Sequence, residues 1–70
     1  MKILFNNEEV IGEVMTNHSM TIHEAVQFAW NLDSVDDQEG LAKQYEEGNP
    51  AVCREDGEYF IDFEAISMQY

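Results

Sequence analysis

Acidic side chains are the chemically active groups that stand out in this chain, both by their number and by their spacing. Its 70 residues include fifteen Asp and Glu but only three Lys and Arg, which gives a formal net charge of −12. Most of the acids fall into four clusters, which are Glu8-Glu9, Asp36-Asp37-Glu39, Glu46-Glu47 and Glu55-Asp56-Glu58. Such a surface repels nucleic acid and anionic membranes, and it attracts basic protein surfaces or cations.

The clusters allow two classes of function. In the first, the chain is a non-enzymatic interaction domain that binds a basic protein surface, such as the groove of a protein that handles nucleic acid. DNA-mimic inhibitors are of this kind, and the chain resembles them in size and charge while sharing no motif with them. In the second, it is a small cytoplasmic accessory or housekeeping domain whose acidity serves only solubility. Carboxylates in rows on one face would favour the first class, and an even scatter the second.

We predict the first class, with a partner held by acidic clusters and one aromatic side chain. The predicted partner-binding residues are Asp36, Asp37, Glu39, Glu46, Glu47, Glu55, Asp56, Glu58 and Trp30. Trp30 lies at the margin of the apolar face of a predicted helix, where a Trp most often covers the edge of the core. The alternative is an anchor ringed by acids, which would suit contact with a basic groove.

Nucleophilic catalysis has no candidate in this sequence. Cys53 points inward in the predicted strand register, so we expect a buried and unreactive thiol. The serines lack a Gly-rich or nucleophile-elbow context, and they are Ser19, Ser34 and Ser67. Since a domain of this size also has little room for a substantial cleft, we expect no enzymatic activity, no catalytic residues and no cofactor.

Metal binding is not indicated either. A calcium-binding loop needs oxygen ligands at alternate positions and a central Gly, whereas the run that starts at Asp33 has Val35 at its third position and no Gly at its sixth. His18 and His23 lie five residues apart, which does not bring two imidazoles onto one metal along a helix. We therefore expect no metal site.

Length and composition describe a small folded protein. A hydrophobic content of 44% is not that of a disordered acidic tail, and 70 residues make one domain, 1–70. The single Cys53 leaves no internal disulfide. The apolar run 1–5 is too short for a signal peptide and no stretch is long enough to span a membrane, so we expect a cytoplasmic protein with no membrane partner and no direct contact with nucleic acid. Carboxylates along the strand edges oppose pairing, which predicts a monomer rather than a homodimer.

The first 15 residues predict a β-hairpin. Extended runs at 1–5 and 10–15 flank a four-residue loop, Asn6-Asn7-Glu8-Glu9. In this register Phe5 faces Val10, and Lys2 lies opposite Glu13. The apolar face then contains Met1, Ile3, Phe5, Val10 and Val14, and a polar connection follows at 16–20.

Two amphipathic helices follow. The first begins after Thr21, which forms a capping box with Glu24, and its apolar positions extend to Leu32 at a period of 3.6 residues. The second is predicted for 35–47, with Ser34 as its cap. Gly40 weakens this helix by about 1 kcal/mol.

The last third predicts a second hairpin. Strands at 51–54 and 58–63 flank the three-residue loop Glu55-Asp56-Gly57. This register pairs Arg54 with Glu58 and puts Cys53 on the apolar face. The alternating tail 65–70 predicts a final strand, with a short helical turn as the alternative.

Together these elements predict an α+β fold in the order ββααββ. An antiparallel sheet built from the two hairpins has the two amphipathic helices packed on one face. This arrangement follows because each hairpin offers one apolar face and each helix one apolar stripe.

Overall fold

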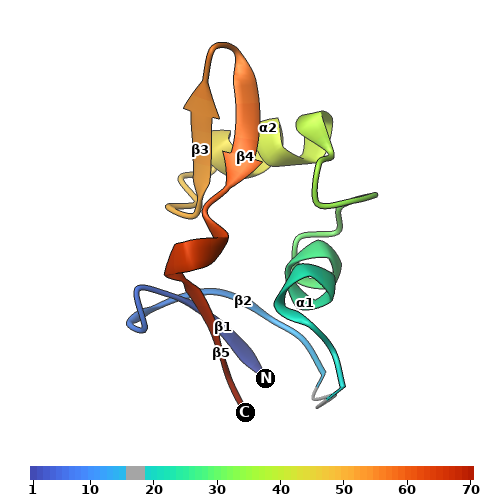
Figure 1. Ribbon diagram of the computed structural model, residues 1–70, viewed down its shortest axis with the longest axis vertical. Coiled ribbons are helices and arrows are strands. Elements are labelled where there is room, and N and C mark those ends of the chain that lie inside the picture. Colours follow the sequence, from blue (N-terminus) through green and yellow to red (C-terminus); the bar gives the residue numbers. More distant parts are fainter. Residues whose placement is uncertain (16–18) are drawn as a thin grey trace.

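The fold has the α+β class and the element order that the sequence predicts. The computed structural model describes residues 1–15 and 19–70 (Figure 1). Its elements in chain order are β1 (Lys2–Phe5), β2 (Glu9–Glu13), α1 (Ile22–Ala29), α2 (Gln38–Glu46), β3 (Val52–Glu55), β4 (Glu58–Ile61), the short 3-10 helix η1 (Phe63–Ala65) and β5 (Ile66–Gln69). Residues 16–18 of the predicted polar connection, His18 included, lie outside the described residues.

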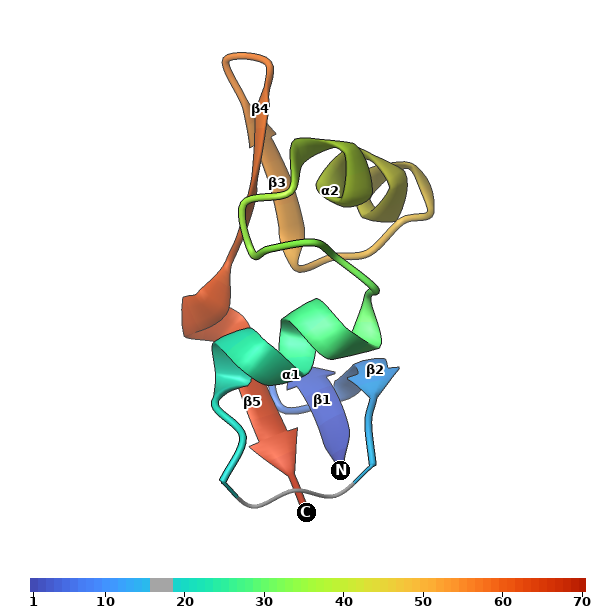
Figure 2. The ribbon, with the colours of Figure 1, turned by 90° about the vertical axis from the view of Figure 1, so that its right-hand side faces the viewer.

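The strands divide into two antiparallel sheets, where the sequence predicts a single sheet, because neither strand of the second hairpin pairs with a strand of the first. β2, β1 and β5 make a three-stranded sheet in that order, and β3 pairs with β4. Helix α1 packs on the three-stranded sheet and α2 on the β3–β4 hairpin, which gives an elongated molecule of 35 × 24 × 19 Å (Figure 2). Between β4 and β5, η1 turns the chain from one half to the other. Both halves contribute to one core, which contains Ile3, Ala25, Val26, Trp30, Leu32, Leu41, Ala51, Val52, Ile61 and Ile66.

The first hairpin departs from its predicted register near the turn. Lys2 pairs with Glu13 as predicted, whereas Phe5 pairs with Glu9 and not with Val10. A β-bulge in β2 absorbs the one-residue difference between the two ends of the hairpin.

The turn and the bulge decide which side chains of β2 reach the core. Asn6 and Asn7 adopt left-handed φ values of 53° and 61°, which shortens the loop to the three residues before β2. The bulge then turns Ile11 toward the core, and it leaves Val10, a predicted core residue, 52% exposed.

Helix α1 begins where the sequence predicts. The Thr21 hydroxyl accepts the N–H of Glu24 at 3.2 Å, and the Glu24 carboxylate accepts the N–H of Thr21 at 3.3 Å, so the capping box is confirmed. The helix ends at Ala29, because Asn31 takes a left-handed φ of 55°. Leu32, predicted as a helical position, lies past this end and is still buried.

Helix α2 begins three residues later than predicted, and Asp37 rather than Ser34 caps it. One Asp37 oxygen accepts the N–H of Gly40 at 3.1 Å, while the other accepts the N–H of Asp33 at 3.0 Å. The second bond folds 33–36 into a turn that leads to the helix. In that turn the Ser34 hydroxyl accepts the N–H of Asp36 at 3.2 Å instead of capping a helix.

The second hairpin has a two-residue turn rather than the predicted three-residue loop. Residues 56 and 57 take left-handed φ values of 51° and 79°, which is the geometry that an Asp-Gly turn favours between twisted strands. Glu55, and not Arg54, therefore pairs with Glu58. The one-residue shift moves the side chains of β3 to the opposite face. Cys53 consequently lies half-buried on the outer face, and the prediction of a buried thiol is wrong.

The tail forms the predicted final strand. β5 pairs antiparallel with β1, with Met68 opposite Ile3, so β1 becomes the central strand of its sheet. A short helical turn, the alternative for the tail, occurs just before the strand as η1.

Candidate partner-binding groove

A groove lies between the C-terminal end of α1 and helix α2. It has a volume of about 410 Å³ and is lined by Trp30, Asn31, Asp37, Glu39, Gly40, Ala42, Lys43, Gln44 and Glu46. Four of the predicted partner-binding residues meet here, namely Trp30, Asp37, Glu39 and Glu46. Glu39 and Glu46 belong to different acidic clusters, but they stand about two helical turns apart on one side of α2.

Trp30 lines the groove as a core residue. Its side chain is 6% exposed, and its indole N–H donates to the carbonyl of Ile11 at 2.9 Å. Because Ile11 is the bulged residue of β2, this bond ties the end of α1 to the edge of the three-stranded sheet. The prediction of a Trp at the core edge is confirmed, and Trp30 offers a partner little surface.

Asp37 contributes a negative charge at the start of α2. Its pKa is lowered below the usual range, because its oxygens accept backbone N–H bonds, first from Asp33 and second from Gly40. These bonds stabilise the ionised carboxylate. Asp37 is therefore charged at neutral pH while it caps the helix.

Gly40 allows the segment before α2 to approach the helix closely. A Cβ at this position would lie 2.5 Å from Leu32 Cδ2 and 2.9 Å from Asp37 Oδ2. Leu32 is held in the core and Asp37 by its two hydrogen bonds, and a side chain at 40 would displace both. The residue that weakens the helix thus permits the packing beside the groove.

The balance of charge in the groove is negative. Asp37, Glu39 and Glu46 carry negative charges and Lys43 a positive one, and the other lining residues are uncharged. Among residues 1–15 and 19–70, no three His, Cys, Asp or Glu side chains converge so that they could hold a metal ion. The carboxylates are therefore spread along the groove, which suits several separated cationic groups better than one ion.

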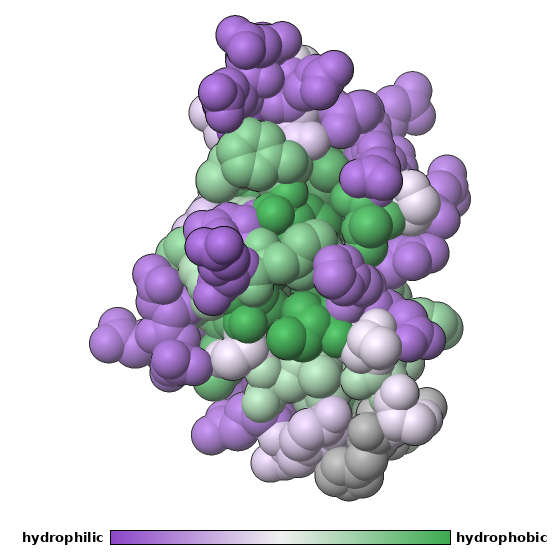
Figure 3. Space-filling view, in the orientation of Figure 1, coloured by the Kyte–Doolittle hydropathy of each residue, from purple (hydrophilic) through white to green (hydrophobic). Residues whose placement is uncertain are grey.

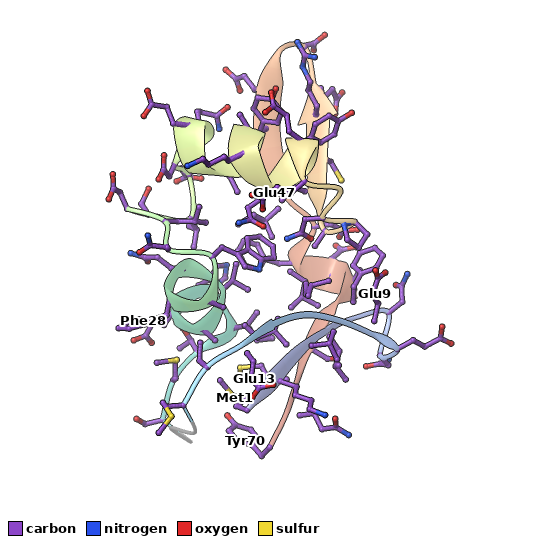
Figure 4. The ribbon with its side chains drawn as sticks, turned by 180° about the vertical axis from the view of Figure 1, so that it is seen from behind. Met1, Glu9, Glu13, Phe28, Glu47 and Tyr70 are labelled. Atoms are coloured by element: carbon purple, nitrogen blue, oxygen red, sulfur yellow. The ribbon has the colours of Figure 1, made fainter. Side chains whose placement is uncertain are left out.

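The remaining predicted residues lie elsewhere on the molecule. Glu47 lines a second groove, of about 210 Å³, together with Glu9 of β2, and both are labelled in the view from behind (Figure 4). Asp36 is exposed in the turn before α2 and lines neither groove. The last cluster occupies the tip of the β3–β4 hairpin, at the top of Figure 1, and consists of Glu55, Asp56 and Glu58. The predicted surface is thus divided among four places: the two grooves, the turn before α2 and the tip of the hairpin.

Sequence reasoning missed three polar residues of the groove. Lys43 lies four residues after Glu39, and Gln44 lies four residues after Gly40. This helical spacing indicates that each pair shares one side of α2, so the sequence contained a signal for both residues. Asn31 gave no such signal, because it was expected inside a helix and not at its left-handed end.

Comparison of the chain with protein families, with curated proteins and with solved structures finds no match. In the part of the chain that the structure describes, no helix is long and apolar enough to cross a membrane. Function therefore has to be inferred from the groove and its charge.

Proposed function

We propose that the chain is a non-enzymatic interaction domain that binds a basic surface of another protein through the groove between α1 and α2. The observation that supports this most directly is the composition of the groove, in which three carboxylates meet one ammonium group within a chain of net charge −12. Lys and Arg side chains of a partner would supply the complementary charge and several hydrogen-bond donors.

Long-range attraction and short-range pairing act at different steps of such binding. The net charge steers a basic partner toward the domain and raises the association rate, and salt screens this effect. Within the groove, exposed ion pairs contribute about 0.2–1 kcal/mol each, so pairs with Glu39 and Glu46 together contribute about 1 kcal/mol. We therefore expect a reversible interaction that depends on ionic strength.

The proposal is narrower than mimicry of nucleic acid along a whole face. The acidic clusters occupy the α2 groove, the hairpin tip and the side of β2, and this separation argues for a local site. Proteins that handle nucleic acid are one class of basic partner that would fit it.

Titration with a hexa-arginine peptide tests the groove. Trp30 is the one tryptophan of the chain and lines the groove, so its fluorescence reports on binding. We expect Glu39→Gln/Glu46→Gln to raise Kd about fivefold. Glu8→Gln/Glu64→Gln removes the same charge from exposed residues outside both grooves and should have a smaller effect. Raising the salt from about 10 to 150 mM should weaken binding, because the Debye length falls to about 8 Å.

The solubility class predicts a different result. If both double variants weaken binding equally, the peptide responds only to net charge and the groove is not its site. Absence of a saturable fluorescence change would likewise favour acidity that serves solubility only.

A further inference from the structure

The β3–β4 hairpin has an outer face that lies away from α2. The helix packs against the inner face, where Val52 and Ile61 are buried. The outer face carries the cross-strand pair Cys53 and Phe60, and Phe60 is 44% exposed. In the space-filling view the tip of the hairpin is hydrophilic, and apolar surface begins directly below it (Figure 3).

Acidic side chains border this apolar pair. Because side chains alternate along a strand, Glu55 and Glu58 also lie on the outer face, as the next pair on that face after Cys53 and Phe60. The nearby cation lies on the inner face, since the guanidinium carbon of Arg54 is 5.7 Å from the ring centroid of Tyr59. The outer face therefore combines an apolar pair with two carboxylates.

The two edges of the hairpin differ in their hydrogen bonding. On the β4 edge, the Gln38 side chain replaces a neighbouring strand, because its amide N–H donates to the Tyr59 carbonyl and its Oε1 accepts the Tyr59 N–H, both at 2.8 Å. On the β3 edge, the N–H and C=O of Arg54 point away from β4, because residues 54 and 59 form a non-hydrogen-bonded pair, the second pair from the turn. No described residue bonds to these two groups, so this position of the edge is open to pairing.

We propose that the β3 edge and the adjoining outer face dock an extended segment of a partner protein in which an apolar and a basic residue stand two positions apart. The backbone of this segment pairs with Arg54. Its apolar side chain packs beside Cys53 and Phe60, and its basic side chain, two positions on, lies beside Glu55. A second copy of this chain is a poor occupant, because it would bring another −12 charges to the acidic tip.

A capped hexapeptide that alternates Lys and Val is the probe. The control is the same peptide methylated at its backbone nitrogens, which keeps the charge but removes the hydrogen-bond donors. Amide NMR of the full chain should show shifts at Cys53, Arg54 and Phe60, together with slower hydrogen exchange at Arg54. We expect the methylated peptide to bind roughly tenfold more weakly, because strand pairing depends on backbone hydrogen bonds.

Two variants test the edge and the charge separately. Arg54→Pro removes the outward N–H at an edge position that can accept proline, and it should abolish the shifts. Glu55→Gln/Glu58→Gln should weaken binding of the peptide roughly fivefold. If Arg54→Pro does not fold, this double variant still tests whether the peptide binds at the hairpin. Glu39→Gln/Glu46→Gln removes the same charge from the α2 groove and should leave the hairpin shifts in place.

Three outcomes overturn the proposal. Shifts confined to the groove residues would mean that basic segments bind only there. Equal binding of the methylated peptide would exclude strand pairing. A concentration-dependent dimer, detected by sedimentation and abolished by Arg54→Pro, would make a second copy of the chain the occupant.

Discussion

Replacing Gln38 by Met is expected to loosen the contact between α2 and β4. The Gln38 amide makes two hydrogen bonds of 2.8 Å to the backbone of Tyr59, and Met can make neither while it keeps a similar length and helix propensity. A typical hydrogen bond contributes about 0.5–1.5 kcal/mol to stability. Both bonds are exposed, and water can replace them. We therefore expect the loss of the two bonds to lower the free energy of unfolding by about 1 kcal/mol. In a domain of this size that lowers the melting temperature by about 4–8 °C.

Gln69→Met is the matched control, because Gln69 is exposed and its side chain makes no hydrogen bond to a described residue. Thermal melts followed by circular dichroism measure the stability of both variants, and NMR measures hydrogen exchange at the Tyr59 amide. Exchange at Tyr59 should become faster in Gln38→Met alone. If it stays at the wild-type rate and the two Met variants melt alike, the Gln38 side chain does not close the β4 edge.

The cap, the core tryptophan, one carboxylate and the net charge give further tests. Thr21→Ala should lower the free energy of unfolding by about 1 kcal/mol in thermal melts, because it removes the capping box of α1; an unchanged melt would mean that the box contributes nothing. Trp30→Phe should lower the free energy of unfolding, measured in urea, by about 2 kcal/mol, because the Ile11 carbonyl loses its hydrogen-bond donor. The lowered pKa of Asp37 stabilises the native state above the pKa of the unfolded carboxyl, and this stability is lost as the pH falls through the lower native pKa. Urea midpoints should therefore fall less on acidification in Asp37→Asn than in the wild type. Raising the salt from about 10 to 150 mM should raise the melting temperature by screening the repulsion among the carboxylates, and a flat midpoint would contradict this.

The sequence predicts the elements well where one interaction within a few residues decides the structure. Thr21 and Glu24 form such a pair, and they locate the start of α1. Where two local structures have similar free energies, a single additional interaction decides between them. Ser34 and Asp37 are both good caps, and the bond from Asp33 to Asp37 selects the second. The turn at 56–57 likewise admits two loop lengths, and the choice between them moves Cys53 from one face to the other.

The groove could be predicted only in part, because contacts between distant segments form it. Glu39 and Glu46 share one side of a helix, which their spacing indicates. The position of Trp30 depends on a bond to Ile11, 19 residues away in the sequence, and on a bulge that no residue type reveals beforehand. The separation of the hairpin cluster from α2 is also a result of tertiary structure, which charge patterning along the chain does not contain.

The pairing of β5 with β1 has a consequence for the order in which the chain can fold. Residues 38–61 hold α2, β3 and β4 without interruption, so these elements can come together through contacts that are local in the sequence. The central strand β1 can pair with β2 locally, but its other edge stays unpaired until the far end of the chain arrives and Met68 lies opposite Ile3. Closing so long a loop costs chain entropy that the hairpin half does not have to overcome. The wall of the groove that α2 contributes can therefore form through local contacts, whereas the sheet to which Trp30 is bonded is completed only when β5 has paired with β1.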